Sequence, residues 1–232
     1  MCGIVGYTGF QDAYDIVING LRRLEYRGYD SAGIVLEDKN NNFEVKKTKG
    51  KVSDLVDISE NLKGTSHIGM GHTRWATHGV PSDRNSHPHV SNDGKIALVH
   101  NGIIENYDTI KTMLIGKGFT FLSETDTEVL VNLIQYILDT QNVDFPQAVR
   151  YALNEVYGAY AITVMHKDYP GVLVVGRLGS PLAIGLGDKE YFIASDASPF
   201  VEFTKEAVYL EDGHMATISL ENGVDIRSIK EN

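Results

Sequence analysis

The sequence predicts one α+β domain in which extensive antiparallel sheet is covered by helices. Three observations lead to this fold class. Helical periodicity is concentrated before residue 158, short strands with short turns fill the chain from residue 159 onward, and no Pro-rich or low-complexity segment divides it. Because few helices interrupt the later strands, we expect antiparallel neighbours rather than βαβ units. Sheets enclosed between helical layers would accommodate both parts of the chain.

Apolar residues at helical spacing, together with stop and capping signals, mark the expected helices. The strongest follows Thr125 and Glu128, which form a capping-box pattern ahead of an apolar stripe from Val129 to Leu138. Pro146 suits the first turn of the next helix. The expected helices cover residues 11–27, 53–62, 104–117, 125–138 and 145–157.

Short apolar or β-branched runs bounded by turn residues mark the expected strands. The polar stretch 77–92 has little periodicity, and a connection of this length inside a compact domain is usually functional or mobile. The expected strands cover residues 3–6, 31–36, 43–47, 67–73, 96–100, 119–122, 159–165, 172–176, 182–186, 191–194, 207–210 and 215–220.

The composition is that of a globular protein, with 232 residues, 42% apolar and 22% charged, and a net charge of 21 − 31 = −10. This acidic balance, with no Lys/Arg-rich run, argues against binding to nucleic acid or to a membrane surface. No apolar stretch is long enough to span a bilayer. The first ten residues lack the basic and apolar regions of a signal peptide, so we expect a cytoplasmic protein.

The single cysteine is residue 2, which excludes an internal disulfide framework and a cysteine-cluster zinc site. The following Gly3–Gly6 segment resembles a strand that would tie the terminus into a sheet. If Met1 is removed, thiol and α-amine share one residue, with ordinary pKa values of about 8.5 and about 7.7–8.0. The amine can then accept the thiol proton and return it to a leaving nitrogen, which suits acyl transfer from an amide. The alternative is an incidental cysteine.

Attack on an amide creates an oxyanion, which needs hydrogen-bond donors. Asn101 and Gly102 end an apolar strand and could supply a side-chain amide and a backbone N–H together. The same dipeptide is also a favoured tight turn, and the spacing leaves both interpretations open.

A second group of residues could bind an α-amino acid. Arg74, at a strand end beside Trp75, could hold a carboxylate bidentately while the indole forms a wall of the pocket. Asp126, in the first turn of the capped helix, could hold the ammonium group. A surface salt bridge and an ordinary acid at a helix N-terminus are the respective alternatives.

Six of the eight histidines lie between His67 and His100, which raises the question of a metal site. His87, His89 and Asp83 are the candidate ligands, but Pro88 separates the two histidines and no matching ligand pair follows. Solvated or hydrogen-bonded loop histidines are therefore the preferred interpretation, and neither a metal nor a cofactor is expected.

Five segments occur together and in order: MCGIVG (1–6), LEYRGYDSAG (24–33), GHTRWATHG (71–79), HNGIIEN (100–106) and SETDTE (123–128). They resemble the glutaminase domains of glutamine–fructose-6-phosphate aminotransferases, a family of class II glutamine amidotransferases, over nearly the whole chain. The resemblance implies an N-terminal-nucleophile hydrolase fold, with two stacked antiparallel sheets between helical layers.

The resemblance also implies roles for the matching residues. Cys2 would be the nucleophile, and Asn101 and Gly102 the oxyanion hole. Glutamine would be bound by a further set, with Arg74 on the α-carboxylate, Asp126 on the α-ammonium, Trp75 closing over the substrate and Arg27 organising the site. Thr77 and His78 would also line this pocket.

Residues 1–232 are therefore expected to form a single type-2 glutamine amidotransferase domain that hydrolyses L-glutamine to L-glutamate and ammonia through a γ-glutamyl thioester. The family's C-terminal sugar-phosphate isomerase portion, which uses the ammonia to make glucosamine 6-phosphate, is absent from this sequence, and the full-length family enzymes are expected to be homo-oligomers. Two alternatives stay open. The chain could be the glutaminase domain of a relative such as amidophosphoribosyltransferase, or a non-catalytic binding module that retains Met1.

Overall fold

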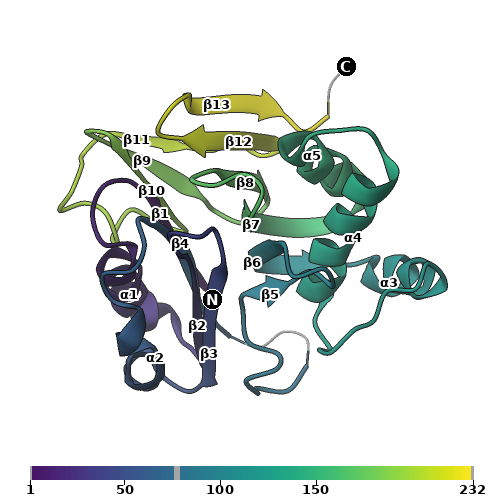
Figure 1. Ribbon diagram of the computed structural model, residues 1–232, viewed down its shortest axis with the longest axis horizontal. Coiled ribbons are helices and arrows are strands. Elements are labelled where there is room, and N and C mark those ends of the chain that lie inside the picture. Colours follow the sequence, from purple (N-terminus) through teal and green to yellow (C-terminus); the bar gives the residue numbers. More distant parts are fainter. Residues whose placement is uncertain (1, 76–78, 231–232) are drawn as a thin grey trace.

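The computed structural model describes residues 2–75 and 79–230, so Thr77 and His78 lie outside the described residues. Two antiparallel sheets stack between helices (Figure 1). The first sheet has seven strands, and the start of the chain lies near its middle. Its strands, in spatial order, are β11 (Ala207–Tyr209), β9 (Ala183–Gly187), β10 (Glu190–Ala194), β1 (Gly3–Thr8), β4 (Ile68–Arg74), β2 (Ser31–Glu37) and β3 (Phe43–Lys49).

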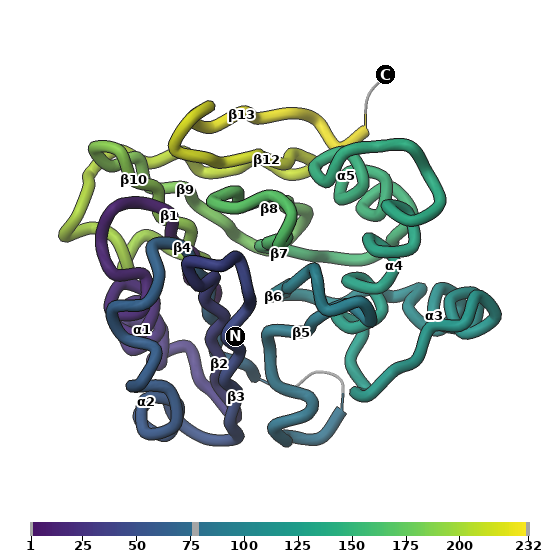
Figure 2. Tube along the Cα trace, viewed as in Figure 1, coloured from purple at the N-terminus to yellow at the C-terminus, as the bar shows by residue number. Residues whose placement is uncertain are grey.

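The second sheet has six strands, and Figure 2 follows the chain through it to its last strand at the sheet edge. Its strands, in spatial order, are β13 (Gly223–Ser228), β12 (His214–Ser219), β8 (Leu173–Leu178), β7 (Gly158–His166), β6 (Ile96–Ile104) and β5 (His89–Val90).

Helices cover the outer face of each sheet (Figure 1). On the seven-stranded sheet lie α1 (Ala13–Leu24) and α2 (Val52–Ser59), each followed by a 3₁₀ turn. On the six-stranded sheet lie α4 (Asp126–Thr140) and α5 (Phe145–Glu155), with α3 (Tyr107–Gly116) packed against α4. Three apolar cores result, one beneath each helical layer and one between the sheets. The predicted α+β architecture is confirmed.

Side-chain caps explain where two helices begin. The Asp12 carboxylate accepts the Tyr14 amide at 3.2 Å, and the Thr125 hydroxyl accepts the Glu128 amide at 3.3 Å. The predicted capping box is only half formed, because the Glu128 carboxylate instead accepts the amides of Leu122 and Ser123 at 2.8 and 2.7 Å.

The strand expected at residues 119–122 is not formed. Two of its backbone amides donate to side chains rather than to a neighbouring strand: the Thr120 amide donates to the Asn92 side chain at 2.8 Å, and the Leu122 amide donates to Glu128. Two strands were not predicted, β5 inside the polar stretch 77–92 and β13. The two residues of β5 give too short a pattern to detect, and β13 is largely exposed, with Val224 and Ile226 as its apolar residues.

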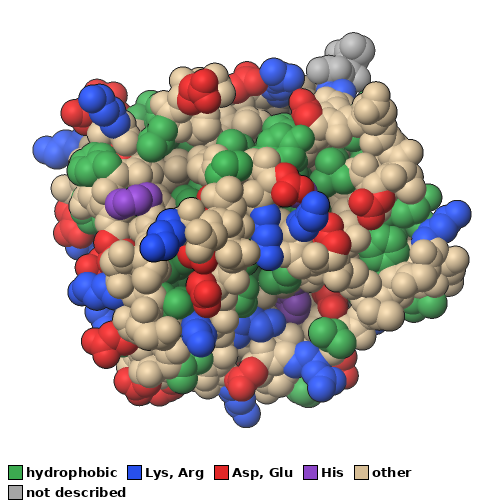
Figure 3. All heavy atoms as spheres, viewed as in Figure 1, with side chains coloured by type: hydrophobic (Ala, Val, Ile, Leu, Met, Phe, Trp, Pro, Cys, Tyr) green, Lys and Arg blue, Asp and Glu red, His purple; other side chains and the backbone are tan. Residues whose placement is uncertain are grey.

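The surface matches the composition. Figure 3 shows acidic and basic side chains interspersed over one face of the molecule, with no large area of a single sign. Among the described residues, no helix has both the length and the apolar character needed to cross a membrane.

Candidate active site

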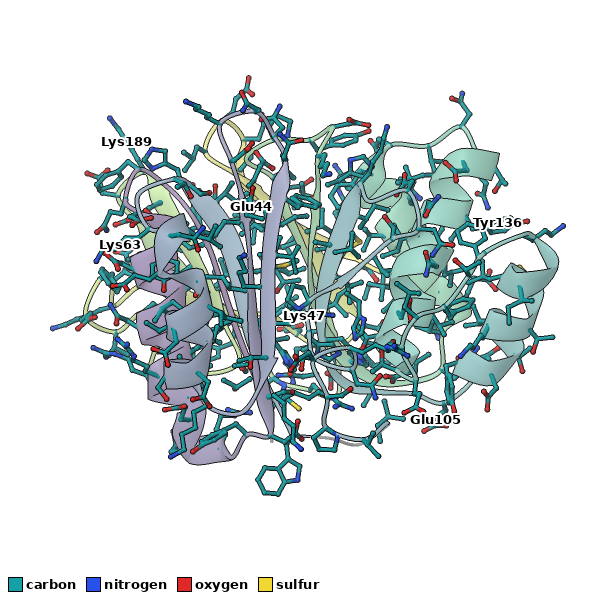
Figure 4. The ribbon with its side chains drawn as sticks, turned by 60° about the horizontal axis from the view of Figure 1, so that its bottom comes forward. Glu44, Lys47, Lys63, Glu105, Tyr136 and Lys189 are labelled. Carbon is teal, nitrogen blue, oxygen red and sulfur yellow. The ribbon has the colours of Figure 1, made fainter. Side chains whose placement is uncertain are left out.

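A pocket of about 430 Å³ opens at one end of the two sheets. It collects residues from the start of the chain, from the ends of β4 and β6, and from the N-terminus of α4. Figure 4 views the sheets edge-on, with Glu105 marking the position after β6. The lining residues are Cys2, Arg27, Arg74, Trp75, His87, His100, Asn101, Gly102, Ile103, Thr125, Asp126, Thr127, Ser180 and Pro181.

Cys2 is held in the pocket because β1 pairs on both sides. Gly3 lies opposite Thr73 of β4, and the Ile4 amide donates to the Ser195 hydroxyl at 2.7 Å. The Cys2 Sγ accepts the Trp75 amide at 3.1 Å. Burial raises the pKa of the Cys2 thiol, and the hydrogen bond from Trp75 opposes that shift. The thiol therefore needs a base before it can act as a nucleophile at neutral pH.

Asn101 and Gly102 lie inside β6 rather than at its end, so the tight-turn interpretation is wrong. Asn101 Nδ2 donates to the Cys2 carbonyl at 3.2 Å, which places the amide beside Cys2. Gly102 has a φ of +130°, and a Cβ there would lie 2.0 Å from the Ala159 carbonyl oxygen. Only glycine fits this backbone.

Arg74 ends β4 with its side chain buried, which excludes the surface salt bridge. Its Nη2 donates to the Gly79 carbonyl at 3.1 Å, and its Nη1 lies 3.9 Å from the Asp30 carboxylate. These contacts fix the guanidinium as a localised positive charge on the pocket wall.

Asp126 provides the opposite charge. It is buried at the first position of α4, and its Oδ2 accepts the Ile104 amide at 2.8 Å. The end of β6 is thereby tied to the helix N-terminus, whose dipole favours the carboxylate. Arg74 and Asp126 thus place a buried positive and a buried negative charge at the pocket, the two charges needed for the α-carboxylate and α-ammonium groups of an amino acid.

Trp75 lines the pocket and is 54% exposed. Its indole lies against the backbone of Gly28, where a Cβ would come within 2.5 Å of Trp75 Cε3 and where φ is +91°. The glycine that ends the first helical segment therefore also leaves room for the indole.

Arg27 lines the pocket from the 3₁₀ turn after α1, and its Nη1 pairs with the Asp196 carboxylate at 3.0 Å. The same oxygen accepts the Tyr26 hydroxyl at 2.7 Å. Burial raises the pKa of Asp196, but hydrogen bonds from Ser198, Tyr26 and Arg27 outweigh it and leave that pKa below its ordinary value. Asp196 was not predicted, because it follows β10, about 170 residues from the arginine that it holds.

Four histidines form a buried group at the pocket: His72, His87, His89 and His100, of which His87 and His100 line it. His87 and His100 both contact the Thr127 hydroxyl, at 2.9 and 3.0 Å. Burial lowers the pKa of His72 to about 3, and those of His87 and His89 well below their ordinary value. These four histidines are hydrogen-bonded, as expected, but they are buried rather than solvated. Across residues 2–75 and 79–230, no group of three His, Cys, Asp or Glu side chains is arranged to hold a metal ion.

Lys47 projects from β3 between the two layers, as Figure 4 shows, and its Nζ donates to the Arg84 carbonyl at 3.4 Å. Burial lowers the pKa of Lys47, while Glu128 and Asp83 oppose this shift. Asp83, a candidate metal ligand in the sequence, instead accepts the Lys49 amide at 2.6 Å.

Every predicted site residue that the structure describes lines this one pocket. They come from segments up to 124 positions apart in the chain (126 − 2). The sequence prediction missed the arrangement of the buried histidines at the pocket and several further residues of its wall, which are Ile103, Thr125, Thr127, Ser180 and Pro181. The clustering of histidines in the sequence was the available signal for the histidine group.

Two stacked antiparallel sheets between helices, with the second residue of the chain at the pocket, define an N-terminal-nucleophile hydrolase fold. The family model described as a glutamine amidotransferase domain matches residues 56–221. The chain belongs to this family of enzyme domains. Arg74, Asn101, Gly102 and Asp126 lie inside the matched range, and Cys2 lies before it.

Curated relatives are similar along almost the entire chain. Glutamine–fructose-6-phosphate aminotransferase (isomerizing) of Bacteroides thetaiotaomicron is 55% identical over 94% of this chain, and that of Thermus thermophilus is 47% identical over 99%. The chain spans only 36% and 37% of these relatives' lengths.

Solved structures have the same fold. Glutamine phosphoribosylpyrophosphate amidotransferase from B. subtilis, complexed with ADP and GMP, aligns with a TM-score of 0.83 and 29% identity over 100% of this chain and 50% of its own. A glutamine aminotransferase class-II domain protein from Silicibacter pomeroyi aligns with a TM-score of 0.66 over 98% of this chain and 99% of its own. At 16% identity, the second shows the fold alone.

Proposed function

We propose that this chain hydrolyses L-glutamine to L-glutamate and ammonia, with Cys2 as the N-terminal nucleophile. The supporting observation is the position of the Cys2 thiol in a pocket that also contains the Asn101 amide and the buried Arg74 and Asp126. With Met1 removed, residues 2–232 would act as one glutaminase domain.

In the proposed first step, the Cys2 α-amine takes the thiol proton and the sulfur attacks the side-chain carbonyl carbon of glutamine. The carbonyl oxygen becomes an oxyanion that accepts hydrogen bonds from Asn101 Nδ2 and from the Gly102 N–H. The ammonium form of the α-amine then returns the proton to the substrate nitrogen. The carbon–nitrogen bond breaks, ammonia leaves, and a γ-glutamyl thioester remains on sulfur.

Water completes the reaction. The α-amine removes a proton from the water as its oxygen attacks the thioester, and the same oxyanion hole stabilises the second tetrahedral intermediate. The carbon–sulfur bond breaks, and the sulfur recovers the proton. No further group is needed, because glutamine and water supply all the atoms of the products.

The buried charges select the substrate. Arg74 would bind the α-carboxylate bidentately, and Asp126 Oδ1 would accept the α-ammonium while Oδ2 keeps its bond to Ile104. Trp75 would close over bound glutamine and exclude water from the first acyl transfer. Thr77, His78 and Arg27 are proposed to complete the pocket.

The likeness to much longer aminotransferases supports a proposal for the whole protein. We propose that ammonia from this domain passes to a C-terminal sugar-phosphate isomerase portion, which forms glucosamine 6-phosphate from fructose 6-phosphate in a cytoplasmic homo-oligomer. The same likeness favours this assignment over a phosphoribosyl acceptor, because the solved phosphoribosylpyrophosphate amidotransferase is only 29% identical.

The test is the release of glutamate and ammonia from glutamine by the purified chain, with asparagine as the comparison substrate. Wild type is expected to hydrolyse glutamine in strong preference to asparagine, and Cys2→Ala to be inactive but folded. Equal hydrolysis of both amides, or activity in Cys2→Ala, would contradict the proposal.

A further inference from the structure

The imidazole of His72 lies beside the side-chain oxygen of Asn101, whose amide nitrogen contacts the Cys2 carbonyl. We propose that His72 is a positioning residue that holds the Asn101 amide with its N–H groups toward the reacting carbonyl. This inference rests on the proposed glutaminase function, in which that amide stabilises the oxyanion.

The contact is short and fully buried. His72 Nε2 lies 2.9 Å from Asn101 Oδ1, and His72 has no exposed surface. On the other side of the same amide, Nδ2 donates to the Cys2 carbonyl at 3.2 Å. The amide is therefore held from both ends.

The Cys2 carbonyl determines which way the amide faces. A carbonyl oxygen only accepts hydrogen bonds, so the atom of Asn101 beside it must be Nδ2. Oδ1 then faces His72, and His72 Nε2 must carry a proton to donate to it. Burial lowers the pKa of His72 to about 3, so the ring is neutral at pH 7 and has one proton to place. The bond to Asn101 places that proton on Nε2.

The imidazole of His72 is itself held in place by His87. His87 packs against it with ring centroids 4.1 Å apart and planes at 67°, and the His87 Nδ1 lies 3.1 Å from the His72 Nδ1. The other nitrogen of His87 contacts the Thr127 hydroxyl, on the helix that begins with Asp126. The orientation of the amide is thus coupled to the end of the pocket that would bind the ammonium group.

Without His72, Asn101 would lose the hydrogen-bond donor that contacts Oδ1. The side-chain amide would then no longer be held in one orientation rather than the flipped one. A displacement of about 1 Å in a catalytic group can cost about 10²-fold in rate. The loss should appear in kcat, because the amide interacts with an oxyanion that exists only after attack.

The test measures glutamine hydrolysis by the purified chain for His72→Gln and His72→Asn. Gln can place an N–H near the position of Nε2, whereas Asn is one methylene shorter and cannot. Both variants put a polar amide in the buried site. A difference between them therefore reports where the N–H group lies rather than the cost of burying a polar side chain. His166→Leu is the control, because His166 is a buried histidine of β7 that does not line the pocket.

We expect His72→Asn to lower kcat by about 10²-fold with KM changed less than about threefold. His72→Gln should recover most of the rate, and His166→Leu should match wild type. Added to Asn101→Ala, the His72→Asn change should have no further effect on kcat, because His72 acts through that amide.

Three results would overturn the inference. They are an equal loss in the Asn and Gln variants, no loss in His72→Asn, or a full additional loss in the Asn101→Ala background. If Asn101→Ala alone left kcat unchanged, the oxyanion assignment itself would fail, and the inference with it. Asn101→Ala alone therefore distinguishes failure of the oxyanion assignment from failure of the role proposed for His72.

Discussion

The backbone of Trp75 holds the sulfur of Cys2: its amide donates to Sγ at 3.1 Å, and its carbonyl accepts from the thiol at 3.4 Å. Trp75, which is proposed to close over the substrate, is thus hydrogen-bonded to Cys2, the proposed nucleophile. Movement of the Trp75 segment would therefore change the environment of the thiol. In the proposed mechanism, substrate closure and thiol activation are coupled through this contact.

Replacing Asn101 by Ala should remove one of the two oxyanion donors. We expect kcat to fall by about 10²–10³-fold with little change in KM, because the donor acts on the transition state rather than on bound glutamine. Steady-state kinetics of glutamine hydrolysis checks this. A rise in KM with unchanged kcat would show that Asn101 binds substrate instead.

Asp126→Asn should have the opposite kinetic signature. The amide oxygen can still accept the Ile104 N–H, so the end of β6 stays in place, but the negative charge facing the substrate ammonium is lost. We expect KM for glutamine to rise by about 10–100-fold, since a hydrogen bond to a charged group contributes about 1.5–3 kcal/mol. An unchanged KM would contradict the assignment.

Gly102→Ala should destabilise the protein, because φ is +130° and the new Cβ would lie 2.0 Å from the Ala159 carbonyl oxygen. Strain of this kind costs at least about 1–3 kcal/mol. Gly116→Ala is the matched control: this glycine lies in α3 with nothing within 4 Å of an added Cβ. We expect Gly116→Ala to be neutral or stabilising in thermal denaturation, and similar melting temperatures for both variants would refute the steric argument.

Glu37 should make stability depend on pH. Burial raises its pKa from 4.5 to about 7, Asp38 adds to the shift, and a hydrogen bond from the Gly171 backbone opposes it. Because the folded state holds this proton more tightly than the unfolded state, stability should fall as pH rises from about 4.5 to about 7, by at most about 3 kcal/mol.

Glu37→Gln removes the charge and should therefore flatten that dependence. Urea denaturation at pH 5 and pH 8 compares the two proteins, and the variant should gain stability relative to wild type at the higher pH. Glu37 lies at the opposite end of β2 from the strand end beside Arg74, so glutaminase activity should not change. Parallel pH profiles for the two proteins would exclude Glu37 as the cause.

Local signals predicted most of the fold. The apolar stripe and Thr125 cap gave α4, and short apolar runs gave most strands. Errors arose where side chains outside the expected strand accept its backbone amides, as Asn92, 28 positions away, does for residue 120 and Glu128, six positions away, does for residue 122. Such contacts depend on tertiary packing, which no local window contains.

The site residues also divide into those that local sequence could predict and those that depend on tertiary packing. Cys2 and Asp126 could be proposed from their chemistry and their place at element ends, and Asn101 from its chemistry, although it lies inside β6. The interaction of Asp196 with Arg27, and of His72 with Asn101, depends on how the strands and loops are placed in space. For His72, the residues flanking it in the sequence do not show which partner its imidazole would meet.

In the proposed mechanism, the sulfur and the base belong to the same residue, the first of the mature chain. The most direct test of this mechanism is to prepare two forms of the protein, one beginning at Cys2 and one retaining Met1, to verify each by intact mass, and to treat both with a glutamine-like electrophile. We expect that only the form beginning at Cys2 hydrolyses glutamine and carries one adduct, mapped to Cys2. Equal glutaminase activity in the form that retains Met1 would contradict the mechanism.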